Sequence, residues 1–385
     1  MKIILILFIF ILSFTFQLPV QAYPHFVGFG YTSCITCHYN PFGNGPLNDY
    51  GRALSATAIS AKWNHHDKYS EEKLAQSSGF FLKVPKQQWF RPSLDYRGLF
   101  IKRSLGQKNE DNELIHMQGD ANITLRLNEA RNIILSASIG YAPTPLAQEE
   151  NEEVKNYRTR EHYIGYRPNP KIGMYLGLMD KIYGVRIAEH TTFGRAINDI
   201  SHNDQSHGLQ VHYARENFEL GLGYYLGNFV QEEDLRSKGF SLKADYVVSH
   251  KSSIGISVLK TANNYVEKLA TAVHTITAVG KGSSILFELG QNTTTPENLN
   301  KETEKSNYGF LQSYVNLTRG VFLLQSIDYF KNPNNEEYLR FGPGIQIFPM
   351  QRIEIRGELY NTKNFSDVSS TKDSWDMLLQ LHTWF

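Results

Sequence analysis

The chain has 385 residues, with 39 Lys and Arg against 38 Asp and Glu, so its formal net charge is only +1. Without a basic cluster or a Gly-rich phosphate loop, it gives no support for a nucleic-acid partner, and we expect none. A hydrophobic content of 41% and a mean hydropathy of −0.38 are typical of a soluble protein. A transmembrane β-barrel has the same average, because only alternate residues of its strands face lipid.

Residues 1–22 predict a secretory signal peptide. Lys2 supplies a positive charge, residues 3–16 form an unbroken apolar core, and Val20 and Ala22 place small residues at the cleavage positions. A retained membrane anchor is the alternative, but this apolar run is short for a spanning helix. No run of eighteen apolar residues follows, so we expect a mature chain that begins near Tyr23 and has no helical membrane span.

Residues 23–62 contain the two cysteines of the chain, Cys34 and Cys37, with His38 directly after the second. A C-x-x-C-H sequence is the attachment site of c-type haem. Each thiol forms a thioether with one vinyl group of the porphyrin, and the histidine ligates the iron as the proximal ligand. The sequence therefore predicts one covalent haem c, and we define residues 23–62 as a c-type haem-binding segment.

Two other uses of the cysteine pair have less support. A structural zinc site would need two more soft ligands, and the chain has no further cysteine. A thioredoxin-like redox pair would need a βαβ context, and the character of the sequence changes too soon after Cys37 to supply one.

The second axial ligand of the iron is open. No methionine lies between His38 and Met117, which argues against a nearby His/Met pair. His25 is the candidate distal ligand, because it lies inside the compact segment. His65 and His66 fall in a polar stretch that we assign to a linker over residues 63–87.

The haem-binding segment is too small to fold around a core of its own. Residues 40–46 are dense in turn formers, and Asn48 or Asp49 is placed to cap a short helix through Leu54 to about Ile59. A segment of about forty residues cannot bury much apolar surface. We therefore expect the haem to supply most of its interior, or the segment to dock against something larger.

From residue 88 onward the sequence alternates with a period of two. Apolar residues stand at every second position from Ile115 to Leu127, with polar residues between them. This alternation is long for a strand of a soluble sheet and suits a strand tilted across a membrane. It recurs over residues 237–249, 352–359 and 375–385, whereas residues 321–330 alternate poorly.

Strands and turns together predict a closed barrel over residues 88–385. About sixteen strands are expected, at 88–104, 113–129, 132–144, 157–168, 172–186, 206–216, 217–229, 237–249, 252–264, 268–281, 282–295, 306–319, 321–331, 335–350, 351–364 and 372–385. Short turns alternate with long polar connections such as 147–156 and 187–205, which is how up-and-down outer-membrane barrels are built. The predicted fold is all-β: an antiparallel transmembrane β-barrel of about sixteen strands, preceded by a small c-type haem segment.

The order of signal peptide, single C-x-x-C-H and barrel resembles a known family. This family comprises the fused outer-membrane monohaem c-type cytochrome–porins, known from bacteria that take electrons from extracellular ferrous iron. At residue level the resemblance rests on Cys34, Cys37, His38 and the following Tyr50-Gly51-Arg52 stretch. The Phe42-Gly43-Asn44-Gly45 turn departs from the iron-oxidising members. The terminal Phe385 is similar to the assembly signal of outer-membrane barrels.

The resemblance implies roles for particular residues and partners. Cys34 and Cys37 would hold the haem, His38 would be the proximal iron ligand, and Arg52 is a candidate contact for a haem propionate. The implied function is an electron-transfer protein in the bacterial outer membrane, surrounded by its lipid. It would connect an extracellular donor or acceptor, such as a metal ion, with a periplasmic electron carrier. Whether it also acts as an extracellular metal-ion oxidase is open.

The position of the haem decides between the mechanisms. An apolar band about 25 Å tall separates periplasm and exterior, so we expect the haem segment to plug the lumen. Inward polar residues are expected to surround it: His116, Arg126, Arg356 and His382. The alternative is a diffusion porin whose haem segment docks at the periplasmic mouth for redox partnering or sensing. A solute channel with a structural haem is a third interpretation.

Overall fold

The computed structural model describes residues 24–31, 33–43, 45–63, 69–79, 89–141, 157–187, 191–249, 251–297, 302–365 and 372–385, without the side chains of Pro24, His25 and Lys372. The proposed signal peptide therefore lies outside the described residues. Among the helices that are described, none combines the length and apolarity that crossing a membrane requires.

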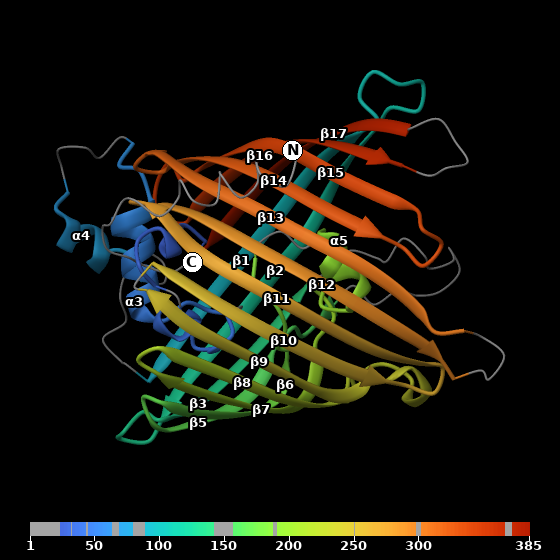
Figure 1. Ribbon diagram of the computed structural model, residues 1–385. Coiled ribbons are helices and arrows are strands. Elements are labelled where there is room, and N and C mark those ends of the chain that lie inside the picture. The colour runs from blue at the N-terminus through green and yellow to red at the C-terminus, as the bar shows by residue number, and fades with distance from the viewer. Residues whose placement is uncertain are drawn as a thin grey trace.

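Sixteen antiparallel strands close into a barrel (Figure 1). Seventeen strand segments form one sheet, and two of them, β4 and β5, pair with β3 as parts of a single interrupted strand. Pairing of β1 with β17 closes the ring. The segments are β1 Phe90–Arg103, β2 Asp111–Leu127, β3 Ile133–Tyr141, β4 Tyr157–Arg158, β5 His162–Asn169, β6 Ile172–Met179, β7 Ser206–Arg215, β8 Phe218–Gly227, β9 Lys238–Ser249, β10 Ser252–Ala262, β11 Val266–Gly280, β12 Ser283–Pro296, β13 Glu304–Thr318, β14 Val321–Lys331, β15 Glu337–Ile347, β16 Ile353–Asn364 and β17 Lys372–Trp384. The predicted fold class and strand number are confirmed.

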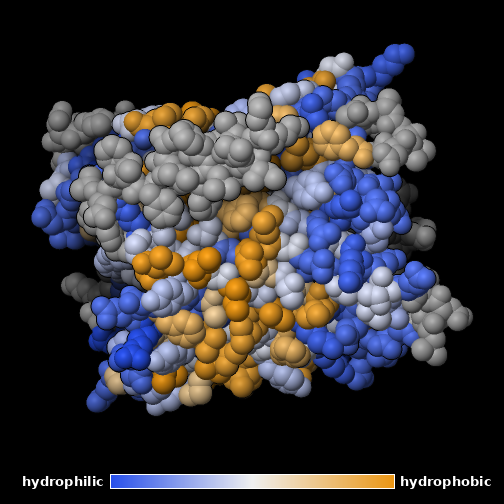
Figure 2. Space-filling view, viewed as in Figure 1, coloured by the Kyte–Doolittle hydropathy of each residue, from blue (hydrophilic) through white to orange (hydrophobic). Residues whose placement is uncertain are grey.

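The apolar residues of the alternating strand pattern lie on the outer surface of the barrel. Phe240, Tyr246 and Val248 of β9 are 51%, 54% and 63% exposed, although each is a large apolar side chain. Figure 2 shows hydrophobic residues gathered across the middle of the strands, with hydrophilic residues toward both ends. An apolar band around a closed barrel, with polar rims, is the surface that a lipid bilayer requires.

The prediction that His116 faces the lumen is wrong. His116 lies on the outer surface, where its Nδ1 is 2.8 Å from the hydroxyl of the exposed Tyr96. The register between β1 and β2 shifts after Arg97, which pairs with Gln118, whereas the next residue pairs with His116. This bulge inserts one residue at Met117 and thereby moves His116 to the opposite face.

The described residues between 24 and 79, which we call the N-terminal segment, pack at the end of the barrel that carries the short turns (Figure 1). Its helical pieces are α2 Pro24–Val27, η1 Cys34–Thr36, α3 Asp49–Leu54, the π-helix η2 Ser55–Ile59 and α4 Glu71–Gln76. Backbone hydrogen bonds join it to two turns: Gly282 donates to Gly28 at 2.8 Å, and Ala61 donates to Phe348 at 2.8 Å. The predicted cap is confirmed, because Asn48 is the N-cap of α3.

The connection from β6 to β7, residues 180–205, folds back into the barrel. It contains the short helix α5 Phe193–Ile197. The Val185 amide donates to Glu288 on β12 at 2.6 Å, and the Gly184 amide donates to Ser257 on β10 at 3.0 Å. Ile187, Arg195 and His202 line the cavity inside the barrel, so the prediction of an external loop over residues 187–205 is wrong for these residues.

The inner wall of β12, β13 and β14 is unusually apolar for a barrel lumen. Leu286, Phe310, Phe322 and Leu324 are at most 6% exposed. They pack in one cluster with residues of the N-terminal segment and of the β6–β7 connection: Phe26, Ile59, Val185 and Ile187. This inward apolar patch is why residues 321–330 alternate poorly, since β14 carries apolar residues on its inner face, Phe322 and Leu324, as well as on its exposed outer face.

Candidate haem-binding site

The C-x-x-C-H motif forms a single tight turn. Cys34 begins the 3₁₀ turn η1, and its carbonyl accepts hydrogen bonds from the Cys37 amide at 3.1 Å and the His38 amide at 3.0 Å. No disulfide joins the two cysteines. His38 then pairs with Leu47 in an antiparallel bridge, which folds the following loop back onto the motif.

Asn48 connects this turn to helix α3. Its side-chain carbonyl caps the helix by accepting from the Gly51 amide at 2.9 Å, and its side-chain amide donates to the Thr36 carbonyl at 3.0 Å. Its backbone amide donates to the Cys37 carbonyl at 2.8 Å. Asn48 therefore hydrogen-bonds both to the first turn of α3 and to the C-x-x-C-H turn, and so fixes the helix and the turn relative to each other.

Gly51 allows the helix to lie directly on the motif. A Cβ built at this position would collide with the carbonyl oxygen and Cα of Cys37. Cys37 itself is 2% exposed. The Tyr50-Gly51-Arg52 stretch that contributed to the family resemblance therefore has a packing role, because only glycine permits this close approach.

Cys34 and His38 line a cavity inside the barrel. Its other walls come from the β6–β7 connection and from the inward faces of several strands, and they include apolar side chains such as Phe42, Ile182 and Trp384. Charged side chains of both signs also line it, and the basic ones are Arg52, Arg97, Arg186 and Lys243. Arg186 already forms an ion pair with Asp180, and Lys243 forms one with Asp245 at 3.5 Å. The residues fit a c-type haem, because they offer a thiol, an imidazole, apolar surface and cations for propionates. Cys37 lies buried beside the cavity, so its thioether stays a prediction.

Burial makes both thiols poor acids. It raises the pKa of Cys34 to about 11, with a further contribution from the Glu219 carboxylate. It raises the pKa of Cys37 to about 12, with Cys34 adding to the effect. Reactive redox dithiols have a lowered thiol pKa. The environment therefore disfavours the thioredoxin-like interpretation.

Arg52 is buried, and its guanidinium already has protein partners. It donates to the carbonyl of Leu47 at 3.4 Å and to that of Pro92 on β1 at 3.3 Å. Burial lowers its pKa. Because it also lines the cavity, a propionate contact stays a prediction beside this structural role.

The histidines near the motif differ from those that the sequence analysis favoured. The side chain of His25 and the whole of His65 and His66 lie outside the described residues. Two other histidines, His202 and His382, line the same cavity as His38. His382 was expected to face inward, whereas nothing in the local sequence around His202 indicates the cavity.

Three other residues face the inside of the barrel as the sequence predicts: Arg126, Arg356 and His382. Arg356 is buried and forms an ion pair with Glu358 at 2.7 Å. His382 Nδ1 lies 3.0 Å from Glu354 Oε2. Arg126 points into the mouth of the barrel beside the N-terminal segment.

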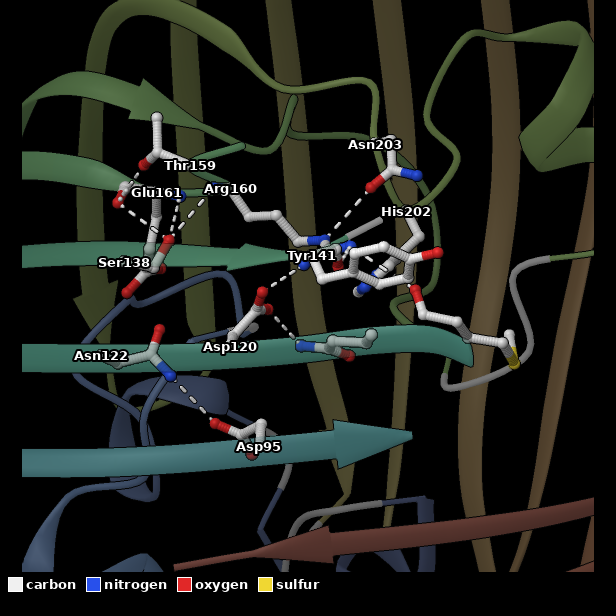
Figure 3. A network of polar contacts seen from close by, with 12 residues as sticks. Asp95, Asp120, Asn122, Ser138, Tyr141, Thr159, Arg160, Glu161, His202 and Asn203 are labelled. Carbon is white, nitrogen blue, oxygen red and sulfur yellow. Dashed lines mark hydrogen bonds and ion pairs between the residues drawn. The ribbon is translucent and has the colours of Figure 1, made fainter. Parts of the chain in front are cut away.

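A polar network fixes the β6–β7 connection against the wall near His202 (Figure 3). Arg160 forms a buried ion pair with Asp120 on β2 and donates to Asn203 Oδ1 at 3.1 Å. It donates also to the Tyr141 carbonyl at 2.9 Å. Arg160 lies in the interruption between β4 and β5, where the Ser138 hydroxyl accepts from the Arg160 and Glu161 amides at 3.0 Å each. The strand break thus turns two consecutive charged residues toward the lumen.

Comparison with known proteins supports the barrel and is silent on the motif. No protein-family model matches the chain, and no curated protein matches it. Solved structures do. OmpT of Vibrio cholerae is 9% identical with a TM-score of 0.61, covering 79% of this chain and 100% of its own. The anion-selective porin of Comamonas acidovorans is 10% identical with a TM-score of 0.58, and the match covers 77% of this chain and 99% of the porin. OprB of Pseudomonas putida is 11% identical with a TM-score of 0.57, and the match covers 86% of this chain and 100% of OprB.

These likenesses define the class by fold alone. The chain has the fold of a bacterial outer-membrane porin. The C-x-x-C-H motif is identified by the sequence and not by these likenesses.

Proposed function

We propose that this protein is a bacterial outer-membrane barrel that carries one covalent haem c at its N-terminal segment and conducts electrons across the membrane. The electrons would pass between an extracellular donor or acceptor, a metal ion among the candidates, and a periplasmic electron carrier. If the extracellular partner is a metal-ion donor, transfer of its electron to the protein would oxidise that ion. The apolar outer band would contact outer-membrane lipid.

Residues of the N-terminal segment would hold the cofactor. Cys34 and Cys37 would form the two thioether bonds, and His38 would ligate the iron. When bound, the haem supplies a reversible one-electron centre whose potential depends on its ligands, hydrogen bonds and burial. Asn48 and Gly51 position the motif, and the basic residues of the cavity wall, Arg52 among them, would neutralise propionates.

One observation carries this proposal. Cys34 and His38 face a cavity within the barrel, and the adjoining wall of β12–β14 is apolar and covered by the N-terminal segment. Water-filled porin lumens are polar. An apolar wall would be costly to expose to water, so the segment is built to stay in place. A redox centre held there would be enclosed by the barrel wall at its short-turn end.

The second axial ligand has more than one candidate. His25 belongs to the same segment as the motif, and we retain it as the first candidate. His202 is added because it lines the cavity together with His38. Electron paramagnetic resonance of His25→Ala and His202→Ala separates them, since only loss of the true ligand converts a low-spin signal into a high-spin one.

The second candidate function is a diffusion porin with a redox partner or sensor segment at its periplasmic mouth. The solved structures favour it, because all of those that match and are named above are outer-membrane proteins or porins. On the comparisons alone, it is the better supported of the two. It requires a continuous water path past the N-terminal segment.

The first test is whether the purified protein holds haem. We expect protein produced with the c-type maturation apparatus to keep its haem through denaturing electrophoresis, because thioether bonds survive unfolding. Cys34→Ala with Cys37→Ala should lose the covalent haem while the barrel still assembles. Wild-type protein with no covalent porphyrin would refute the electron-transfer proposal and leave the porin.

A further inference from the structure

A second recess lies on the other side of the same motif. It opens at the short-turn end between the N-terminal segment and the turns that join β2 to β3 and β5 to β6. Ile35 and Tyr39 line it, whereas Cys34 and His38 line the inner cavity. Residues of one short motif therefore reach both the lumen and this groove, which we name the mouth groove.

The mouth groove carries an unbalanced positive charge. Arg126, Arg131 and Arg167 line it. The side chains of Arg126 and Arg131 make no hydrogen bond or ion pair with any residue that the structure describes, and Arg167 donates only to Tyr175 and to the Tyr39 carbonyl within that set. Three guanidinium groups without a carboxylate partner are poised for an external anion.

The single carboxylate among the described residues of the groove lining is already neutralised. Asp49 receives two hydrogen bonds from Arg91, at 2.6 Å from Nε and at 2.7 Å from Nη2. This bidentate ion pair removes the one charge that would otherwise balance the arginines.

A buried hydroxyl in the lining has no partner within the described structure. Tyr39 is 4% exposed, and its hydroxyl oxygen makes no hydrogen bond to a described residue. Leaving a buried polar group unpaired is costly. Tyr39 packs in a buried cluster with Ile134, Tyr163, Tyr175 and Met179, so this part of the lining is a rigid wall beside the arginines.

The groove faces the periplasm and not the lipid. Arg126 and Arg167 lie on the inward side of their strands, because their neighbours Leu127 and Tyr166 are exposed on the outer face. A lipid headgroup outside the barrel cannot reach an inward side chain. The occupant must therefore arrive from the aqueous side.

We propose that the mouth groove is an oxyanion-binding site at which carboxylates of an acidic, soluble electron carrier dock. The inference rests on the proposed electron-transfer function, since it names the chemistry of the periplasmic partner. Docking there would bring the partner against Ile35 and Tyr39, which adjoin the cysteines and the proximal histidine. Complementary charge would mainly accelerate association and make it sensitive to salt.

The first arm of the test measures binding without using the haem. Fluorescein-labelled hexaglutamate is titrated with the full-length detergent-solubilised protein and followed by fluorescence anisotropy, with labelled hexalysine as the control peptide. We expect hexaglutamate alone to bind. Arg126→Gln with Arg131→Gln should weaken binding about ten-fold, because both unpaired cations are lost. The matched control is Arg215→Gln with Lys281→Gln, which removes two exposed charges from other short turns and should change binding less than about two-fold.

The second arm uses two small redox probes of opposite charge. Ferrous protein gives one electron to ferricyanide, which becomes ferrocyanide, or to hexaammineruthenium(III), which becomes the ruthenium(II) complex. We expect the rate with ferricyanide to fall at high salt and in the Arg126/Arg131 variant, and the rate with hexaammineruthenium(III) to fall in neither.

The outcomes separate this inference from the function on which it rests. If hexaglutamate binds but the protein holds no haem, the anion site stands and the carrier as its occupant is overturned. If the haem is present but neither hexaglutamate binding nor the rate with ferricyanide changes in the Arg126/Arg131 variant, the docking site is overturned. The electron-transfer function then still stands. Binding of inorganic phosphate without binding of hexaglutamate would assign the groove to a small oxyanion and would also overturn docking.

Discussion

At the scale of single residues, Gly51 is the most demanding position in the N-terminal segment. Its replacement by alanine would place a Cβ against the carbonyl of Cys37. We expect Gly51→Ala to shift helix α3 away from the motif, at a cost of about 1–3 kcal/mol. Haem content per barrel, measured by absorption, should fall because the motif loses its support.

The matched control is Gly119→Ala on β2, where a new Cβ would meet nothing within 4 Å. It should leave haem content and barrel assembly unchanged. Equal haem content in Gly51→Ala and Gly119→Ala would contradict the packing argument.

Some residues of the site could be predicted from sequence and others could not. The turn that joins Cys34 to His38 and the cap at Asn48 could be anticipated because both depend on local sequence, and haem attachment at Cys34 and Cys37 stays a prediction. His202 was not recognisable, since its position depends on how a connection of about 25 residues folds back into the lumen. The inward prediction for His116 failed because a bulge, which alternation cannot reveal, exchanged the two faces of β2.

At the scale of elements, the start of helix α3 is the main support of the motif. Asn48→Ala removes both the cap of α3 and the hydrogen bond to Thr36, and we expect a loss of about 1–2 kcal/mol in local stability. Hydrogen exchange at the Gly51 and Arg52 amides should quicken accordingly. Ser70→Ala is the control, because Ser70 caps only its own helix α4. Faster exchange at Gly51 in both variants would argue against the specific role of Asn48.

Helix α4 should respond to acid. A hydrogen bond from Arg319 lowers the pKa of the Glu71 carboxyl, and Lys62 acts in the same direction. Arg319 Nη1 and Lys62 Nζ each lie 2.7 Å from Glu71 Oε1. A carboxyl whose pKa is lower in the folded state stabilises above its unfolded pKa, and this contribution is lost as the pH falls through the lowered value.

The protection factors of the amides of residues 71–77, which are exchange rates corrected for their intrinsic pH dependence, should therefore fall as the solution is acidified below about pH 4. Glu71→Gln should remove most of this pH dependence, whereas Glu72→Gln, at the exposed neighbouring position, should retain it. A pH dependence that survives in Glu71→Gln would show that another group controls the helix.

Most elements of the barrel could be predicted, because lipid imposes a strict period of two on the strands. The exceptions share one cause. The β6–β7 connection and strand β14 both contact apolar partners inside the lumen, so neither follows the pattern expected of an external loop or of a strand with a polar inner face. The sequence could not show this, because the partners come from residues 26–59, far away in the chain.

At the scale of the whole molecule, the N-terminal segment and the β6–β7 connection occupy the lumen from its two ends. We expect planar-bilayer recordings to give a conductance far below that of an open sixteen-stranded porin, because the apolar wall and its cover leave less room for water. A porin-sized conductance from the intact protein would contradict this packing and favour the diffusion porin.

Electron transfer across a sealed membrane tests the central claim most directly. Protein reconstituted in liposomes with an internal electron acceptor is given an impermeant external reductant, and acceptor reduction is followed together with ion flux. The account predicts acceptor reduction by the wild type, none by Cys34→Ala with Cys37→Ala, and little ion flux from the wild type. Ion flux without acceptor reduction in haem-loaded wild-type protein would contradict it.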